Sequence, residues 1–393
     1  MLRGAYPRRA LLAAAIFLAG AACGGALVHY SLFPYPELRW RAHQLSRSFS
    51  PAREGPRADL SLLTIRDSAE VESRRRELVR LIWGRETLPA RLPDAVETGI
   101  EDRRFKSLPD LARIDRLHVR MDFGLDSKIL HFVPARPNGA LVLVHDGHSG
   151  PTGLNAVVAR LLERGYAVAA LTMPLFGDNA RPAVRAGQLG RIVLDDHDKL
   201  LLVAPEAGLR QQYLLEPVPV ALNHLLARSG YREAAMIGLS GGGWTTTLAA
   251  ALDPRIAQSF PVAGSQPPDI VEGPAPADLE MNDPALYTRF SYLDLYLLGS
   301  AGAGRGQLQI LNEFDPCCFA GRAALSYREA VADRARRLGG RFELLIDSSH
   351  QQHRISDWAL ERILAALDSW RGRGGQSAGL TPGNRAAEAR ARP

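Results

Sequence analysis

The chain has 393 residues, of which 46% are hydrophobic and 23% charged, so it can bury a large core and is not disordered throughout. The net charge of +6 comes from arginines near the two ends, namely Arg3, Arg8 and Arg9 and those after residue 370. The part between them is close to neutral, which argues against a nucleic-acid-binding surface.

The N-terminus predicts a membrane anchor. Residues 10–28 carry no charge, follow the three arginines and are long enough to span a bilayer as a helix. Because positive charges stay in the cytoplasm, everything after this segment would cross the inner membrane and be periplasmic or otherwise extracytoplasmic. A cleaved signal peptide is the alternative, since residues 19–21 are small enough for a cleavage site. We expect residues 1–29 to form the anchor or signal peptide.

A juxtamembrane linker and a helical region are expected over residues 30–114. Residues 45–60 are polar and contain proline, which is typical of a spacer. Residues 68–83 place Val71, Leu78 and Ile82 on one face of a helix that begins at Asp67 or Ser68.

Strand-like and helix-like segments alternate from about residue 115 onward. Residues 117–124 and 127–135 predict a hairpin. Further strands are predicted at 140–147, 166–174, 234–239, 258–265, 306–315 and 341–349, and helices at 153–165, 216–230, 242–253 and 356–370. This alternation predicts an α/β fold with a mostly parallel central sheet and helices on both faces.

Two long segments, residues 174–210 and 265–304, interrupt the alternation after the fourth and the sixth predicted strand. Both would follow the carboxyl ends of parallel strands, where open α/β sheets bind ligands, so we expect them to be lid insertions. The aromatic stretch 287–298 predicts core packing, with rings that line a substrate pocket as the alternative. Residues 372–393 are basic and rich in glycine, and we expect a disordered tail there.

The sequence Gly238-Leu239-Ser240-Gly241-Gly242 matches G-x-S-x-G between a predicted strand and a predicted helix. This is the setting of a nucleophile elbow, a sharp turn that presents a serine hydroxyl at the end of the sheet. The main-chain N–H groups at the start of the following helix, beginning with that of Gly241, would stabilise a developing negative charge. A glycine-rich turn without chemistry is the alternative.

A serine needs a base that is held by an acid, and the order serine, acid, histidine is the one expected after such an elbow. Asp315 ends a predicted strand, and His350 and His353 follow the next strand. Three features of residues 115–371 resemble the α/β-hydrolase superfamily: the nucleophile elbow, the order serine, acid, histidine, and the alternation of strands and helices. Within that superfamily, the resemblance is to the serine esterase and dienelactone-hydrolase-like branch. The resemblance implies an α/β-hydrolase catalytic domain with a Ser-His-Asp triad.

The acid and the base of this triad have rivals. Glu313 lies two residues before Asp315 and on the same face of an extended segment. Asp315 is favoured because it stands at the exit of the strand, as the acid of the resembled family does. Asp347 lies on the strand that precedes the histidines and is a weaker candidate. His350 and His353 are equal candidates for the base, and one of them is expected to serve.

The second donor of an oxyanion hole should follow the strand 140–147, where the resembled family commonly has a His-Gly pair. Here the sequence reads His145-Asp146-Gly147, so the N–H of Gly147 is the candidate that joins the N–H of Gly241. Asp146 would oppose the charge of an oxyanion unless its side chain is paired or turned away.

No cofactor and no metal are expected. Residues 145–148 and 195–198 combine imidazoles and carboxylates but lack the spacing of an established metal motif, so solvated or locally hydrogen-bonded side chains are the better interpretation. The adjacent Cys317 and Cys318 are interpreted as two small thiols, with a disulfide as the alternative in an oxidising compartment.

Together these features predict a membrane-anchored serine hydrolase that acts on a carboxylic ester, whether of a small molecule, a lipid or a polysaccharide. An acyltransferase or a peptidase on the same fold is one alternative. A catalytically silent, membrane-tethered binding module is another, although such a module would not need a serine, an acid and a histidine in this order.

Overall fold

The computed structural model describes residues 55–148, 153–231, 233–271 and 278–378, together with residues 20, 21 and 23–25. The chain divides into two units, Met1–Gly55 and Pro56–Pro393, and the fold of the second is described below. No helix within the described residues is both long and apolar enough to cross a membrane. The predicted anchor over residues 10–28 lies almost wholly outside them and stays a prediction.

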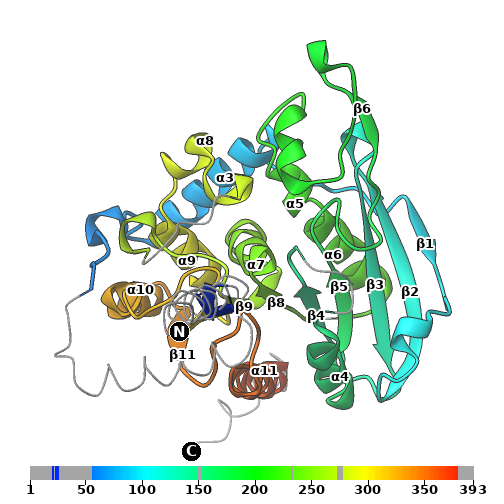
Figure 1. Ribbon diagram of the computed structural model, residues 1–393. Coiled ribbons are helices and arrows are strands. Elements are labelled where there is room, and N and C mark those ends of the chain that lie inside the picture. Colours follow the sequence, from blue (N-terminus) through cyan, green and yellow to red (C-terminus); the bar gives the residue numbers. More distant parts are fainter. Residues whose placement is uncertain are drawn as a thin grey trace, which may run out of the picture. The chain divides into compact units, whose positions relative to one another are not determined.

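A sheet of nine strands forms the centre of the second unit, as Figure 1 shows. The strand order is β1-β2-β3-β5-β4-β8-β9-β10-β11, in which the pairs from β5 to β11 are parallel and the pairs from β1 to β5 are antiparallel. The expected mostly parallel sheet is therefore confirmed. The strands are β1 (Ala95–Glu97), β2 (Leu111–Arg120), β3 (Asp126–Pro134), β4 (Ala140–His145), β5 (Ala167–Leu171), β8 (Glu233–Leu239), β9 (Ile256–Val262), β10 (Gly306–Asn312) and β11 (Arg341–Asp347).

Helices cover both faces of this sheet because successive side chains of its buried strands point to opposite sides. Val142 and Val144 of β4 pack with α4 and α11, whereas Leu141 and Leu143 pack with α6 and α7. The helices α3, α9 and α10 share a further core with α7. The main helices are α3 (Ser68–Trp83), α4 (Asn155–Glu163), α6 (Pro217–Arg228), α7 (Gly241–Leu252), α9 (Tyr292–Ser300), α10 (Leu325–Arg337) and α11 (Asp357–Ala378).

Helices and strands extend beyond both ends of the predicted catalytic domain, residues 115–371, whose boundaries stay a prediction. Residues 68–83 form the predicted helix, with Asp67 as its N-cap, but its apolar face is part of the main core rather than of a separate region. β1 and the first residues of β2 also precede residue 115, and β1 was not predicted because three exposed residues carry no pattern. At the other end, α11 continues to Ala378, so residues 372–378 are helical and not part of a disordered tail.

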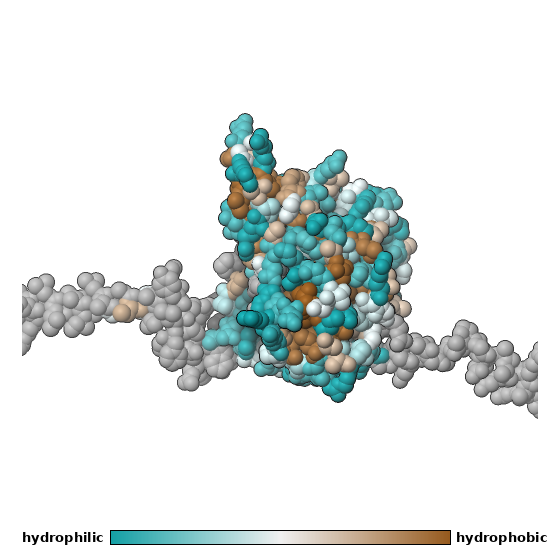
Figure 2. All heavy atoms as spheres, turned by 90° about the vertical axis from the view of Figure 1, so that its right-hand side faces the viewer, coloured by the Kyte–Doolittle hydropathy of each residue, from teal (hydrophilic) through white to brown (hydrophobic). Residues whose placement is uncertain are grey.

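The two insertions contain short elements of their own. The first holds a hairpin of β6 (Ala183–Arg185) and β7 (Arg191–Val193), which projects at the top of Figure 1. Leu189 and Val193 are exposed on it, and Figure 2 shows hydrophobic surface below the hydrophilic tip of this projection. The second insertion holds α8 (Pro284–Tyr287) and α9. All residues of α9 are buried, so the aromatic stretch 287–298 is mainly core. A lid role for either insertion stays a prediction.

The turn between β8 and α7 brings main-chain atoms into direct contact. A Cβ atom on Gly238 would lie 2.0 Å from the carbonyl oxygen of Gly242, and one on Gly242 would lie 2.1 Å from the carbonyl oxygen of His145. Real Cβ atoms do not approach other atoms so closely, and both contacts are with main chain that cannot move aside. The glycines of the elbow are therefore required by packing.

We expect Gly238→Ala to lower the free energy of unfolding by about 3 kcal/mol or more, because the new methyl group overlaps main chain in a buried turn. Gly99→Ala is the matched control, since nothing lies within 4 Å of a Cβ at this position and only the positive φ of +69° opposes the change. The control should lose about 1 kcal/mol. Urea denaturation followed by circular dichroism measures both, and equal losses would contradict the packing argument.

Candidate functional site

Ser240 stands alone between β8 and α7, in a backbone conformation that few residues adopt. Its φ of 58° and ψ of −128° lie in a region that is strained for any residue with a side chain. The N–H of Ser240 donates to the carbonyl of Val262 (3.0 Å), which fixes the turn against the end of β9. Since α7 begins at Gly241, the N–H of that residue has no acceptor inside the helix. The strand–turn–helix setting predicted for Ser240 is confirmed.

Asp315 and His353 are joined directly. Nδ1 of His353 lies 2.7 Å from Oδ2 of Asp315. The carboxylate has a buried side chain, and the imidazole is partly exposed. Nε2 of His353 has no hydrogen-bond partner among the described residues, so an Nδ1–H tautomer leaves Nε2 as a free acceptor. Asp315 follows β10 and His353 follows β11, at the same edge of the sheet as Ser240.

Three further donors fix the carboxylate of Asp315. Nδ2 of Asn312 donates to Oδ2 (3.1 Å), and the main-chain N–H groups of Cys317 and Cys318 donate to Oδ1 at 2.9 and 3.2 Å. The two cysteines are joined by a disulfide, so their interpretation as free thiols is wrong. The loop that orients the candidate acid thus contains a covalent link between neighbouring residues.

His350 belongs to a different pair. Its Nε2 lies 3.3 Å from Oδ2 of Asp347, and the side chains of both residues are buried. Burial acts to raise the pKa of Asp347, but the neighbouring imidazole of His350 and the hydrogen bonds from Ser356 and Ser349 outweigh it and hold the pKa well below its usual range. The ionised carboxylate of Asp347, with the ring of His350 packed beside it, therefore stabilises the turn before α11. The two residues form a second acid–histidine pair beside the one that contains His353.

Glu313, the rival acid, is also engaged elsewhere. Its Oε1 accepts from Nε of Arg322 at 2.9 Å, and its N–H donates to the carbonyl of Asp347 at 2.8 Å. The structure thus brings Asp315, and not Glu313, to the exposed imidazole of His353.

The surroundings of Asp146, in the loop after β4, bear on whether its carboxylate would oppose the charge of an oxyanion. The main-chain N–H groups of Gly153 and Leu154 at the start of α4 act on its carboxylate and favour the charged form, while its Oδ2 makes no hydrogen bond within the described residues. Burial raises its pKa to about 7, against the opposing effect of these two N–H groups. The N–H of Gly147 donates to Nδ1 of His145 (3.0 Å), whose pKa burial lowers to about 3. Because that N–H is already used, the structure argues against the expectation that Gly147 is the second oxyanion donor.

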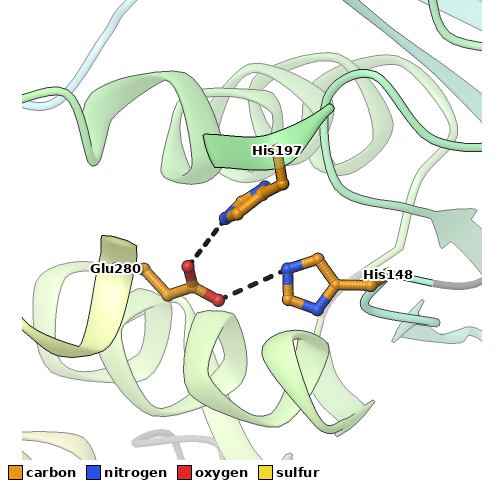
Figure 3. Close-up of side chains that lie close together, drawn as sticks. All are labelled: His148, His197 and Glu280. Carbon is orange, nitrogen blue, oxygen red and sulfur yellow. Dashed lines mark hydrogen bonds and ion pairs between the residues drawn. The ribbon is translucent and has the colours of Figure 1, made fainter. Parts of the chain in front are cut away.

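Three side chains from separate loops meet beside this turn, as Figure 3 shows. Nε2 of His197 lies 2.8 Å from Oε2 of Glu280, and Nε2 of His148 lies 3.5 Å from Oε1 of the same carboxylate. Burial acts to raise the pKa of Glu280, but the hydrogen bond from His197 and the charges of the two imidazoles outweigh it and lower the pKa. The sequence places His148 and His197 in two separate polar segments and does not single out Glu280, because nothing in it links residues so far apart.

Comparisons with known proteins agree with this fold. The chain matches no protein-family model and no curated protein sequence. A glucuronoyl esterase from Solibacter usitatus superposes with a TM-score of 0.51 at 14% identity, over 82% of this chain and 99% of that one. A methylesterase superposes with a TM-score of 0.51 at 17% identity, over 78% of this chain and 67% of that one. The chain has the α/β-hydrolase fold.

A third α/β-hydrolase, an acetyl xylan esterase from Paenibacillus sp. R4, superposes with a TM-score of 0.48 at 14% identity, over 79% of this chain and 99% of that one. At 14 and 17% identity, the two superpositions with a TM-score of 0.51 establish the fold alone.

The two acid–histidine pairs should differ in what they do for stability. We expect His350→Ala to lower the free energy of unfolding by about 2 to 3 kcal/mol, because it leaves a cavity and removes a partner from a buried carboxylate. His353→Ala should cost about 1 kcal/mol or less, since its ring is partly exposed and Asp315 keeps three donors. Thermal unfolding of both variants measures this, and a larger loss for His353→Ala would contradict the assignment.

Proposed function

We propose that this protein is a serine hydrolase that cleaves carboxylic esters through Ser240, His353 and Asp315. The observation that carries the proposal is the 2.7 Å contact between Nδ1 of His353 and Oδ2 of Asp315, at the sheet edge where the strained Ser240 stands. A base oriented by a buried acid, with its second nitrogen free, is what a serine nucleophile needs.

The proposed reaction forms and then hydrolyses an acyl-enzyme. Oγ of Ser240 attacks the carbonyl carbon of the ester while Nε2 of His353 accepts the hydroxyl proton. The protonated imidazole is stabilised by Asp315 and then gives the proton to the alcohol as the C–O bond breaks. Water next attacks the acyl carbon, His353 accepts its proton, and the proton returns to Oγ of Ser240 as the carboxylic acid leaves.

The negative oxygen of the tetrahedral intermediate needs donors that are in place beforehand. The N–H of Gly241 is one, because it begins α7 and points out of the helix. For the second donor we propose the main-chain N–H of His148, the next amide after Gly147. The ring of this residue lies against Gly241, since Cε1 of His148 is 2.7 Å from where a Cβ on Gly241 would be.

The substrate class rests on fold-level analogy with glucuronoyl and methyl esterases. An ester of a carbohydrate or of another envelope component is consistent with an N-terminal anchor. Transfer of the acyl group to an alcohol or amine other than water uses the same three residues and differs only in the acceptor. Product analysis with and without added alcohol separates the two reactions.

A fluorophosphonate probe, which reacts with activated serines, tests the three residues. We expect the wild-type chain to be labelled and Ser240→Ala not to be labelled. Hydrolysis of p-nitrophenyl acetate should fall by about 10⁴-fold or more in Ser240→Ala and His353→Ala and by about 10³- to 10⁴-fold in Asp315→Asn. Longer acyl chains in the same assay would define the size of the pocket.

His350→Ala and Glu313→Gln are the matched controls. The first alters the neighbouring acid–histidine pair, and the second alters the rival acid. Both should keep labelling and hydrolysis within about tenfold of wild type, when measured well below their unfolding temperatures. Equal labelling of Ser240→Ala, or loss of activity in His350→Ala but not in His353→Ala, would refute the proposed triad.

We further propose that residues 10–28 hold the catalytic unit at the inner membrane, on its outer side. The expected result is that the full-length chain stays in the membrane fraction after a carbonate wash and is accessible to protease from the periplasm. Leu18→Arg should release it, since an arginine at the centre of a span costs about 2.5 to 3.5 kcal/mol, whereas Gln44→Arg should not. A shortened, soluble wild-type protein would instead indicate a cleaved signal peptide.

A further inference from the structure

Outside the proposed triad, the unusual feature of the site is the cluster of His148, His197 and Glu280. Its members come from the loop after β4, from the first insertion and from the second insertion, and Figure 3 shows both imidazoles turned toward one carboxylate. One ligand-type atom from each residue lies within 4.8 Å of the other two.

The cluster is buried, but its hydrogen bonding is incomplete. The side chain of Glu280 is fully buried, that of His197 is 7% exposed and that of His148 is 24% exposed. Within the part of the chain that the structure describes, Nε2 of His148 and Oε1 of Glu280 make no hydrogen bond although both atoms are buried. The two atoms face each other in an ion-pair contact of 3.5 Å, and because buried polar atoms rarely go without a hydrogen bond, both remain available to a ligand.

The spacing of the atoms fits a common metal ion. Two ligands of a tetrahedral zinc ion with bonds of about 2.0 to 2.1 Å lie ~3.3 Å apart. Nε2 of His148 and Oε1 of Glu280 are 3.5 Å apart, and the ligand atoms of all three residues lie within 4.8 Å of one another. A hydrogen bond now joins His197 to Glu280, and a metal ion would replace the proton of that bond.

We propose that His148, His197 and Glu280 form a divalent transition-metal site next to the nucleophile elbow. Two imidazoles and one carboxylate favour zinc over magnesium or calcium, which take oxygen ligands. Three protein ligands leave a fourth position for water or substrate, as in zinc sites that are open to solvent. The partly exposed ring of His148 gives the ion a path of entry.

The surroundings of the cluster suit a cation and connect it to α7. The carboxylates of Asp278 and Asp198 act on both imidazoles with a negative field. The main-chain carbonyl of Glu280 accepts from the hydroxyl of Tyr287 (2.8 Å), which in turn accepts from Nε1 of Trp244 in α7 (2.7 Å). An ion held here would therefore tie both insertions to the helix that begins after Ser240.

A second group also brings three possible ligand atoms within 4.8 Å of one another. It consists of Asp315, Cys317 and His353. Its sulfur is part of the disulfide, so it offers no thiolate, and Asp315 and His353 already hold each other. This group supplies a matched control for the proposed site.

The test is metal content of the full-length chain in detergent. After removal of metal with a chelator, the chain is incubated with excess Zn²⁺ or Mg²⁺, desalted and measured by elemental mass spectrometry. We expect about one Zn²⁺ per chain and no retained Mg²⁺ for wild type. By titration, His197→Ala and Glu280→Gln should bind Zn²⁺ at least about 100-fold more weakly, and His353→Ala should bind it like wild type.

Two measurements on the wild-type chain still test the proposed metal site if a variant fails to fold. Zn²⁺ should raise the unfolding temperature of the wild-type chain by a few degrees, and Co²⁺ should give the visible absorption of a four-coordinate site. The proposal is overturned if wild type binds no Zn²⁺, or if His353→Ala loses the ion and His197→Ala keeps it. Because metal content is measured and not hydrolysis, failure here is separate from failure of the proposed triad.

Discussion

Main-chain atoms of Gly238 and Gly242 approach so closely that a methyl group on either residue would overlap carbonyl atoms. This contact makes the chain leave β8 and enter α7 within one residue, and it leaves Ser240 with a φ of 58°. The strain at Ser240 is held by the packing around it, because every residue of α7 is buried. The position of Ser240, the proposed nucleophile, is therefore set by main-chain packing and not by contacts of its side chain.

The structure contains two acid–histidine pairs, Asp347–His350 and Asp315–His353. The environments of the two pairs differ, and this difference favours a different role for each. Asp347 and His350 are both buried and hold the turn before α11. Asp315 is equally buried, but its histidine is partly exposed and lies closer to the acid, at 2.7 Å rather than 3.3 Å. A base must both be oriented and reach its substrate, so the second pair fits catalysis and the first fits structure.

The sequence was sufficient for features that depend on local patterns. Alternating strand and helix segments predicted the sheet, and the G-x-S-x-G turn predicted the setting of Ser240, because periodicity and glycine spacing are local properties. The helix α10 was overlooked although Tyr327, Val331 and Ala335 recur at helical spacing and are buried, since charged residues dominate the segment between them.

Features that depend on long-range contacts could not be predicted. The choice between His350 and His353 follows from which carboxylate each ring meets, and spacing from the last helix does not decide it. The partners of Asp146 lie at the start of α4, across a loop. His148, His197 and Glu280 meet only because the loop after β4 and the two insertions return to the same edge of the sheet.

The complete burial of α7 has a consequence for how such a site can change. Amide hydrogens in a helix without a solvent-exposed face exchange with water mainly through global unfolding, so we expect the amides of α7, which begins directly after Ser240, to exchange slowly. The hairpin of β6 and β7, by contrast, carries exposed Leu189 and Val193 and has little core of its own. We therefore expect substitutions in the hairpin of β6 and β7 to leave the geometry of the turn at Ser240 unchanged.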